Sequence, residues 1–200
     1  MKKSYDILSN HPINVERMKR GLNPANSLWF WGAGTRPMLT SFEEKTGHKG
    51  AMISAVDLLK GIAVGAGMKV IEVEGANGGL DTNYEGKADA AVDVLLNGGC
   101  DFAYIHLEAP DEMGHQGSYE RKVKAIENLD KRIIKRVVEK MEAAGEDFRM
   151  LVLPDHPTPV AIRTHVSDPV PYMLYDSTDK KNNTWSYNCL LYTSPSPRDS

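Results

Sequence analysis

The apolar positions of this chain follow two periods in turn, one typical of strands and one typical of helices. Short apolar runs predict strands at residues 27–31, 51–53, 68–74, 101–107, 148–153 and 170–175. Apolar residues at helical spacing predict helices at residues 11–21, 54–67, 84–96 and 118–144. Strands that alternate with helices indicate βαβ units, so we expect an α/β fold with a mainly parallel sheet and helices on both faces.

The ends of two of these helices can be read from the residues beside them. The segment 118–144 carries the clearest helical pattern, and Gly145 follows it as a C-terminal stop. Its apolar stripe consists of Val123, Ile126, Leu129, Ile133, Ile134, Val137, Val138 and Met141. For the helix at 11–21, Asn14 is the expected N-cap and Gly21 is the expected stop.

Composition and charge exclude several classes of function. Hydrophobic residues make up 41% of the chain and charged residues 26%, as in an ordinary globular protein. The formal net charge of −3 argues against nucleic-acid binding, because a phosphate backbone needs a basic surface. No apolar run approaches the length of a membrane span, and the N-terminus lacks the apolar region of a secretory signal. Two cysteines do not make a disulfide framework, so we expect a cytoplasmic protein.

Acidic and histidine residues gather where two predicted strands end. Asp111 and His115 follow the strand at 101–107, Asp155 and His156 follow the strand at 148–153, and His165 comes soon after. Parallel neighbours would bring the first two loops to the same edge of the sheet. Carboxylate oxygen and imidazole nitrogen are ligands for Zn²⁺ or Mn²⁺. Five such residues exceed the needs of one tetrahedral ion, and two ions about 3.5–4 Å apart would use them better.

Spacing alone also leaves structural interpretations open for these residues. Asp111, four residues before His115, also fits a hydrogen bond within a loop, and Asp155 also fits a cap before Pro157. The other histidines carry no such pattern, and we interpret them as surface or packed residues: His11, His48 and His106.

Three segments resemble the metal motifs of the alkaline phosphatase superfamily: 109–117 (APDEMGHQG), 153–159 (LPDHPTP) and 164–171 (THVSDPVP). Within it, the chain resembles the archaeal-type, 2,3-bisphosphoglycerate-independent phosphoglycerate mutases. The segments that select this family are 31–34 (WGAG), 55–61 (AVDLLKG) and 73–88 (VEGANGGLDTNYEGKA). The resemblance runs from about residue 10 to residue 188 and implies an alkaline-phosphatase-like sheet.

The resemblance implies a role for each candidate residue. Asp111, His115 and His165 would bind one metal ion, and Asp155 and His156 would bind a second. Two divalent ions are implied, with Mn²⁺ the first choice because oxygen and nitrogen ligands are mixed, and Zn²⁺, Co²⁺ and Mg²⁺ open. The implied reaction interconverts 3-phosphoglycerate and 2-phosphoglycerate through a phosphoserine intermediate.

Two basic residues are candidate ligands of the substrate phosphate. Lys87 resembles such a ligand in the family, although a solvated lysine at the start of a helix fits the sequence equally well. Arg36 is a weaker candidate, because loop arginines are usually solvated. The substrate in either case would be a phosphoglycerate.

The resemblance also implies that the chain is the C-terminal half of a longer protein. Full-length members begin with a strand ending in Asp-Gly, followed by the nucleophilic serine, and neither element is found here. We therefore interpret 1–30 as the end of a cap domain and its return linker, and 31–188 as the C-terminal part of the metal-binding domain. The tail at 189–200 resembles a translated sequencing adapter. We assign no catalytic residue and expect the fragment to be inactive as a mutase.

Two other functions stay open on the sequence. A hydrolase of the same superfamily, acting on phosphomonoesters or phosphonates, would use the same metal ligands. A truncated gene product would have no catalytic function. The cap and its arginines would separate a mutase from a hydrolase, because the mutase outcome needs water excluded from the phosphoenzyme.

Overall fold

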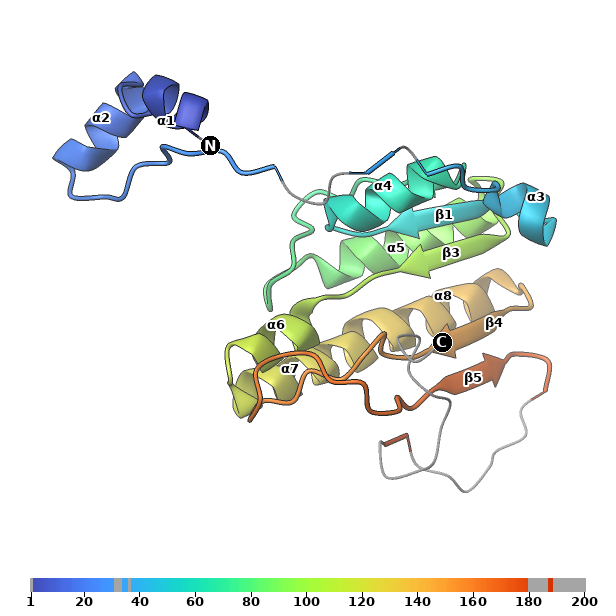
Figure 1. Ribbon diagram of the computed structural model, residues 1–200. Helices are drawn as coiled ribbons and strands as arrows, with labels where there is room; N and C mark the ends of the chain where they lie inside the picture. The colour runs from blue at the N-terminus through green and yellow to red at the C-terminus, as the bar shows by residue number, and fades with distance from the viewer. Residues whose placement is uncertain (1, 31–33, 36, 180–186, 189–200) are drawn as a thin grey trace. The chain divides into compact units, whose positions relative to one another are not determined.

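The computed structural model describes residues 2–30, 34, 35, 37–179, 187 and 188 (Figure 1). The chain forms two compact units, Met1–Met38 and Leu39–Ser200. The first unit contains two short helices, α1 (Lys2–Leu8) and α2 (Pro12–Lys19). Among the described residues, no helix is long and apolar enough to cross a bilayer.

Helix α2 begins differently from the sequence prediction. The N-cap is His11, whose Nδ1 accepts a hydrogen bond from the Ile13 N–H at 3.3 Å. Asn14 is instead buried within the helix, and its side-chain amide donates to the main-chain oxygens of Leu8 and Ala25. The prediction of Asn14 as N-cap is therefore wrong, because this amide serves to tie the flanking segments to the helix.

The second unit contains a parallel sheet with strand order β2–β1–β3. Its strands are β1 (Gly50–Ile53), β2 (Lys69–Val70) and β3 (Phe102–Ile105). A separate antiparallel pair is formed by β4 (Arg149–Val152) and β5 (Met173–Asp176). The expected α/β fold with parallel strands is confirmed, whereas the extension of the parallel arrangement to β4 is wrong for the described residues.

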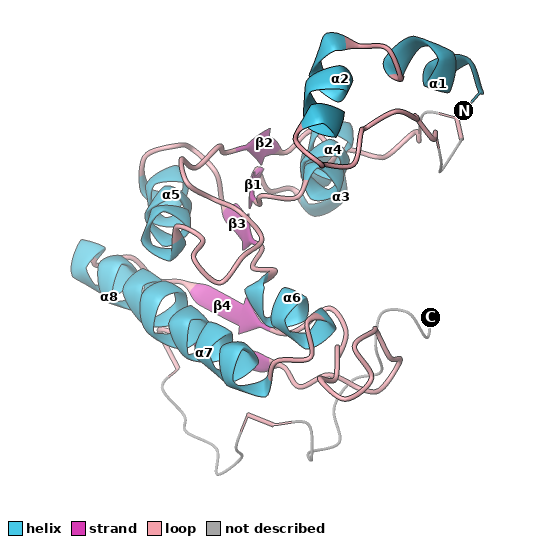
Figure 2. Cartoon of the chain, turned by 90° about the vertical axis from the view of Figure 1, so that its left-hand side faces the viewer, coloured by secondary structure: helices cyan, strands magenta, loops and turns pink. Residues whose placement is uncertain are grey.

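Six α-helices among the described residues of the second unit flank these strands, and Figure 2 shows α5, α7 and α8 on one side and α4 on the other. Their bounds are α3 (Phe42–Thr46), α4 (Asp57–Gly65), α5 (Tyr84–Leu96), α6 (Ala109–His115), α7 (Tyr119–Leu129) and α8 (Lys135–Ala144). The predicted helix at 84–96 is confirmed at both ends. Its N-cap is Asn83, whose side chain accepts from the Gly86 N–H.

The main core lies between α5, α6 and the long helix formed by α7 and α8. Its buried residues are Tyr84, Ala88, Val92, Ala109, Met113, Ala125, Ile133, Val137 and Met141. Ile105 and Leu107, at the end of β3, pack against this cluster. The core thereby fixes the position of α6 relative to the end of β3, where the candidate metal ligands begin.

The long helix contains a π-helical segment, Asp130–Ile134, between α7 and α8. The helix predicted over 118–144 is therefore present, but it carries one wide turn. The wide turn changes which face later residues present, so one regular stripe does not describe the whole helix. Val123 and Ile126, expected to be buried, are 38% and 51% exposed, while Val137 and Met141 after the π-helical segment are buried.

One strand prediction fails and another holds only in part, for a shared reason. The apolar and aromatic run at 27–31 predicted a strand, but residues 27–30 have no strand partner among the described residues, and Phe30 is exposed. The strand predicted at 68–74 is reduced to β2, because the chain turns away before Gly75, which has a left-handed φ of 74°. Apolar composition favours a strand, but a strand forms only where a neighbour supplies hydrogen bonds.

Candidate metal centre

Asp111 and His115 lie on α6, four residues apart and therefore on one face of the helix. Asp111 Oδ2 is 3.2 Å from His115 Nε2. The sequence predicted a loop here, and the structure corrects it. Pro110 stands in the first helical turn, where its missing N–H costs nothing, and the acidic residues of that turn suit the positive end of the helix dipole.

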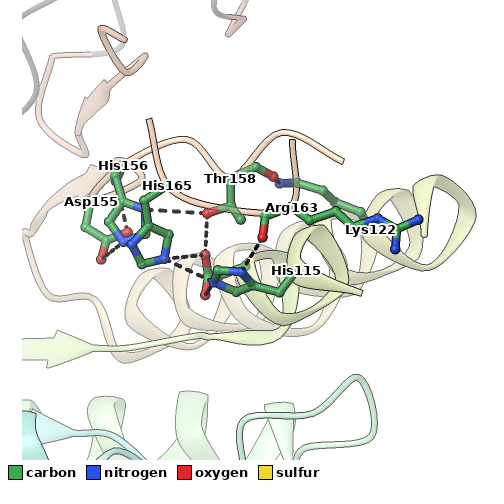
Figure 3. Close-up of polar contacts among 8 residues, drawn as sticks. His115, Lys122, Asp155, His156, Thr158, Arg163 and His165 are labelled. Carbon is green, nitrogen blue, oxygen red and sulfur yellow. Dashed lines mark hydrogen bonds and ion pairs between the residues drawn. The ribbon is translucent and has the colours of Figure 1, made fainter. Parts of the chain in front are cut away.

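His165 reaches the same place from the long segment between β4 and β5. Its Nε2 lies 3.3 Å from Asp111 Oδ1 and 3.1 Å from His115 Nε2. One ligand atom from each of these three residues lies within 4.8 Å of the others. Figure 3 shows the His115 and His165 side chains pointing toward one another. We call Asp111, His115 and His165 the triad.

The hydrogen bonding of His115 decides which of its nitrogens can hold an ion. His115 Nδ1 lies 3.0 Å from the main-chain oxygen of Arg163, and a carbonyl oxygen only accepts. Nδ1 therefore donates a proton, and Nε2 of the neutral ring keeps its lone pair toward His165 and Asp111. Arg163 offers this oxygen from a left-handed backbone with a φ of 58°, a conformation that costs free energy in a non-glycine residue.

A proton or a cation between the triad atoms would stabilise their close approach. A carboxylate and an imidazole nitrogen with its lone pair are both acceptors, and acceptors held about 3 Å apart repel each other. Two nitrogens and one carboxylate oxygen form a donor set that suits Zn²⁺, Mn²⁺ and related divalent ions. The hydrogen bond from His115 to a carbonyl is also the support that metal-binding histidines usually have.

Asp155 and His156 follow β4 and lie beside the triad. Asp155 Oδ2 is 3.1 Å from His156 Nε2. The His156 ring packs against the His165 ring, with centroids 3.7 Å apart. The His156 side chain is 10% exposed and the Asp155 side chain 64% exposed. The structure thus brings His156 against the triad, and Asp155 contacts the cluster through His156.

Comparisons with known proteins agree with this chemistry. Residues 8–190 match the family described as the metalloenzyme superfamily. The chain belongs to the metalloenzyme superfamily. The motif-based resemblance to 2,3-bisphosphoglycerate-independent phosphoglycerate mutases is also confirmed, since the chain is a homologue of proteins so named.

The relatives that this superfamily member matches are longer than the chain itself. It is 54% identical over 181 residues to "2,3-bisphosphoglycerate-independent phosphoglycerate mutase" of Methanosarcina barkeri, covering 90% of this chain and 45% of the relative. It is 49% identical over 182 residues to a "probable" enzyme of that name from Geobacter sulfurreducens, covering 91% and 45%. A solved protein from Pyrococcus horikoshii is similar with a TM-score of 0.78 and 34% identity, covering 92% and 47%. The chain therefore spans a little under half the length of these relatives.

Two further residues of this superfamily member contact the site and were missed by the sequence reasoning. Thr158, which is buried, donates its hydroxyl hydrogen to Asp111 Oδ1. Lys122 on α7 donates from Nζ to the main-chain oxygen of Thr158 at 2.5 Å (Figure 3). Burial lowers the pKa of Lys122, and the nearby Asp111 carboxylate opposes that shift. Thr158 lies within the 153–159 motif, but nothing in its spacing predicts the contact with Asp111.

The two predicted phosphate ligands have different outcomes. Lys87, in the first turn of α5, is fully buried, and its Nζ donates to the main-chain oxygen of His106 at 3.2 Å. Burial lowers the pKa of Lys87, and the negative charge of Glu108 opposes that shift. The interpretation of Lys87 as a solvated lysine is therefore wrong. Arg36 lies outside the described residues.

Proposed function

We propose that this chain supplies the metal centre of a cofactor-independent phosphoglycerate mutase. The whole protein would interconvert 3-phosphoglycerate and 2-phosphoglycerate through a phosphoserine intermediate. The observation that carries the proposal is the triad, whose three ligand atoms lie within 4.8 Å of one another. The 54% identity to the Methanosarcina barkeri protein supports phosphoglycerate as the proposed substrate. This proposal concerns a whole protein, because the chain matches only 45% of that relative.

In this proposal, Asp111, His115 and His165 hold one divalent ion, and Asp155 and His156 contribute to holding a second. Such ions lower the pKa of a hydroxyl nucleophile and neutralise charge on the transferring phosphoryl group. Mn²⁺ is our first choice, and Zn²⁺, Co²⁺ and Mg²⁺ suit the same mixture of oxygen and nitrogen. Arg163 fixes the orientation of the His115 ring through its main-chain oxygen.

Lys87 is the residue that we propose for binding a phosphate oxygen of the substrate. Its ammonium group has three N–H donors, and the hydrogen bond to His106 uses one of them. A cation buried away from water attracts an anion more strongly than a solvated one does. Positive charge placed in advance at a transferring phosphoryl group stabilises the transition state.

A chimaeric enzyme tests the mutase activity. This chain replaces the matching part of the Methanosarcina barkeri relative, and conversion of 3-phosphoglycerate to 2-phosphoglycerate is followed with and without Mn²⁺. We expect metal-dependent conversion that Asp111→Asn abolishes together with metal binding. Lys87→Met is expected to keep the metal and lower turnover by about 10²–10³-fold, as for loss of one transition-state donor.

The controls separate this proposal from its alternatives. Arg149→Ala removes a cation whose side chain is 76% exposed and pairs with Asp176, so metal content and turnover should stay unchanged. Release of inorganic phosphate in place of 2-phosphoglycerate would favour a phosphomonoester hydrolase. A folded, metal-loaded chimaera that does neither would contradict the proposed function.

A further inference from the structure

The Thr158 hydroxyl lies between the triad and the neighbouring Asp155–His156 pair (Figure 3). It donates to Asp111 Oδ1, the oxygen that also faces His165 Nε2 at 3.3 Å. The same hydroxyl oxygen is 3.5 Å from His156 Nδ1. One buried side chain therefore contacts a residue from each of the two groups of candidate ligands.

Thr158 is held in place by contacts to its main chain. Lys122 Nζ donates to the Thr158 carbonyl oxygen at 2.5 Å. Gly114, on α6 between the triad residues, allows this carbonyl to approach the helix, since a Cβ atom at Gly114 would collide with it. The packing and hydrogen bonding of the Thr158 main chain thus set the direction of the hydroxyl group.

The direction of the hydrogen bond has consequences for both contacts. A hydroxyl has one hydrogen, and a carboxylate only accepts, so that hydrogen is used on Asp111. Toward His156 the hydroxyl offers a lone pair, so it accepts from Nδ1 when that nitrogen carries a proton. Asp155 Oδ2, which is also an acceptor, lies 3.1 Å from His156 Nε2, so the hydroxyl and this carboxylate contact the two nitrogens of the His156 ring.

We propose that Thr158 is a positioning residue of the metal centre, which orients the Asp111 carboxylate and the His156 ring through its hydroxyl. The inference rests on the proposed metal centre. Supporting hydrogen bonds to metal ligands typically change metal affinity by about 10–100-fold. The hydroxyl, rather than the shape of the side chain, is therefore expected to set affinity at this position.

The test compares threonine, serine and valine at position 158 in the full chain. Isothermal titration calorimetry with Mn²⁺ and the visible absorption spectrum of the Co²⁺ form report affinity and coordination. We expect Thr158→Val, which is nearly isosteric, to weaken Mn²⁺ binding about 10–100-fold and to alter the Co²⁺ spectrum. Thr158→Ser keeps the hydroxyl and should remain within about threefold of the original chain, with an unchanged spectrum.

A matched substitution at Thr82 controls for the general effect of replacing a buried threonine with valine. Thr82 is also buried, and its hydroxyl oxygen accepts from the Asn77 N–H in a loop that contributes no candidate metal ligand. Thr82→Val should leave Mn²⁺ affinity unchanged. Mn²⁺ affinity of Thr158→Val within twofold of the original chain would overturn the inference, as would an equal loss in Thr158→Ser.

A further variant and a further measurement cover two cases, a valine variant that does not fold and a chain that binds no metal. If Thr158→Val does not fold, Thr158→Ala, which adds no methyl group beside the carboxylate, must show the same loss. If the original chain binds no metal, the proposed function fails, and ¹H–¹⁵N spectra of the histidine rings test Thr158 separately. The His156 and His165 ring signals should then shift in Thr158→Val and not in Thr158→Ser, and unshifted signals would overturn the inference.

Discussion

Two polar clusters of the second unit use similar residue types in opposite ways. Between α5 and the long helix, Arg132 donates to the two Glu85 oxygens at 2.6 and 2.7 Å. One turn further on, Arg136 donates to the two Asp89 oxygens at 2.7 and 2.8 Å. We call these four residues the ladder. In the triad, by contrast, potential acceptors face each other at 3.1–3.3 Å.

The difference lies in which groups face the carboxylates. Each carboxylate of the ladder has a guanidinium in two-pronged contact, so the protein itself satisfies the charges. The triad brings one carboxylate and two imidazoles together, and a proton or a cation between them would stabilise that arrangement. A cluster of paired opposite charges stabilises the fold, whereas one that gathers potential metal ligands around one point is a candidate for function.

The largest expected effect is the response of stability to metal. An ion that binds only the folded chain stabilises it by about 2.7 kcal/mol at a concentration 100 times its Kd. For a chain of this size, that corresponds to a rise in Tm of about 5–10 °C. We expect this rise with Mn²⁺ in thermal unfolding of the original chain and of Arg136→Ala. Asp111→Ala should show none, and an equal rise in Asp111→Ala would break the contrast.

A smaller effect is expected when the ladder is cut. Arg132 is half-exposed, and its guanidinium also lies 4.6 Å from the centre of the Tyr84 ring. Removing the ion pair and this cation–π contact in Arg132→Ala should cost about 1–2 kcal/mol of unfolding free energy in urea denaturation. Metal affinity should not change. Lys124→Ala, which removes an exposed pair with Glu127, is the control and should cost less than about 0.5 kcal/mol.

The smallest expected effect concerns pH. The Arg136 guanidinium holds the pKa of Asp89 at about 2, below its ordinary value of 3.8. A lowered folded-state pKa contributes stability above the unfolded-state pKa, and this contribution is lost as pH falls from about 3.8 toward 2. Between pH 5 and about 2, the original chain should therefore lose more stability than Asp89→Asn. Equal losses of unfolding free energy, measured by urea denaturation, would show that solvent screens the Asp89–Arg136 pair.

The regular part of the fold could be predicted because the spacing of apolar residues indicates its helices and strands. The helix at 84–96 has a clear apolar pattern and an N-cap, and both of its ends are confirmed. Helix α6 could not be predicted, since it is short and contains a proline and a glycine. Its helical state depends on packing of Ala109 and Met113 into the core, which sequence spacing does not reveal.

The candidate site divides in the same way. Residues at the ends of predicted strands, such as Asp111 and His156, could be identified because the edge of an α/β sheet is where ligands bind. The contact of His165 with Asp111 depends on the path of a long loop, so position along the chain indicated only that His165 could join the cluster. Thr158 could not be identified, because its contact depends on the carbonyl that Lys122 and Gly114 place. The metal-binding roles of all these residues stay predictions.

Mn²⁺ titration of the full chain, followed by calorimetry, tests the central claim that the triad holds one divalent ion. His165→Ala removes the ligand that comes from the most distant part of the sequence, and Arg136→Ala cuts the ladder as a matched control. We expect saturable binding in the original chain, the same affinity in Arg136→Ala, and at least about 100-fold weaker binding in His165→Ala. Undiminished affinity in a folded His165→Ala chain, or no saturable binding in the original, would contradict the claim.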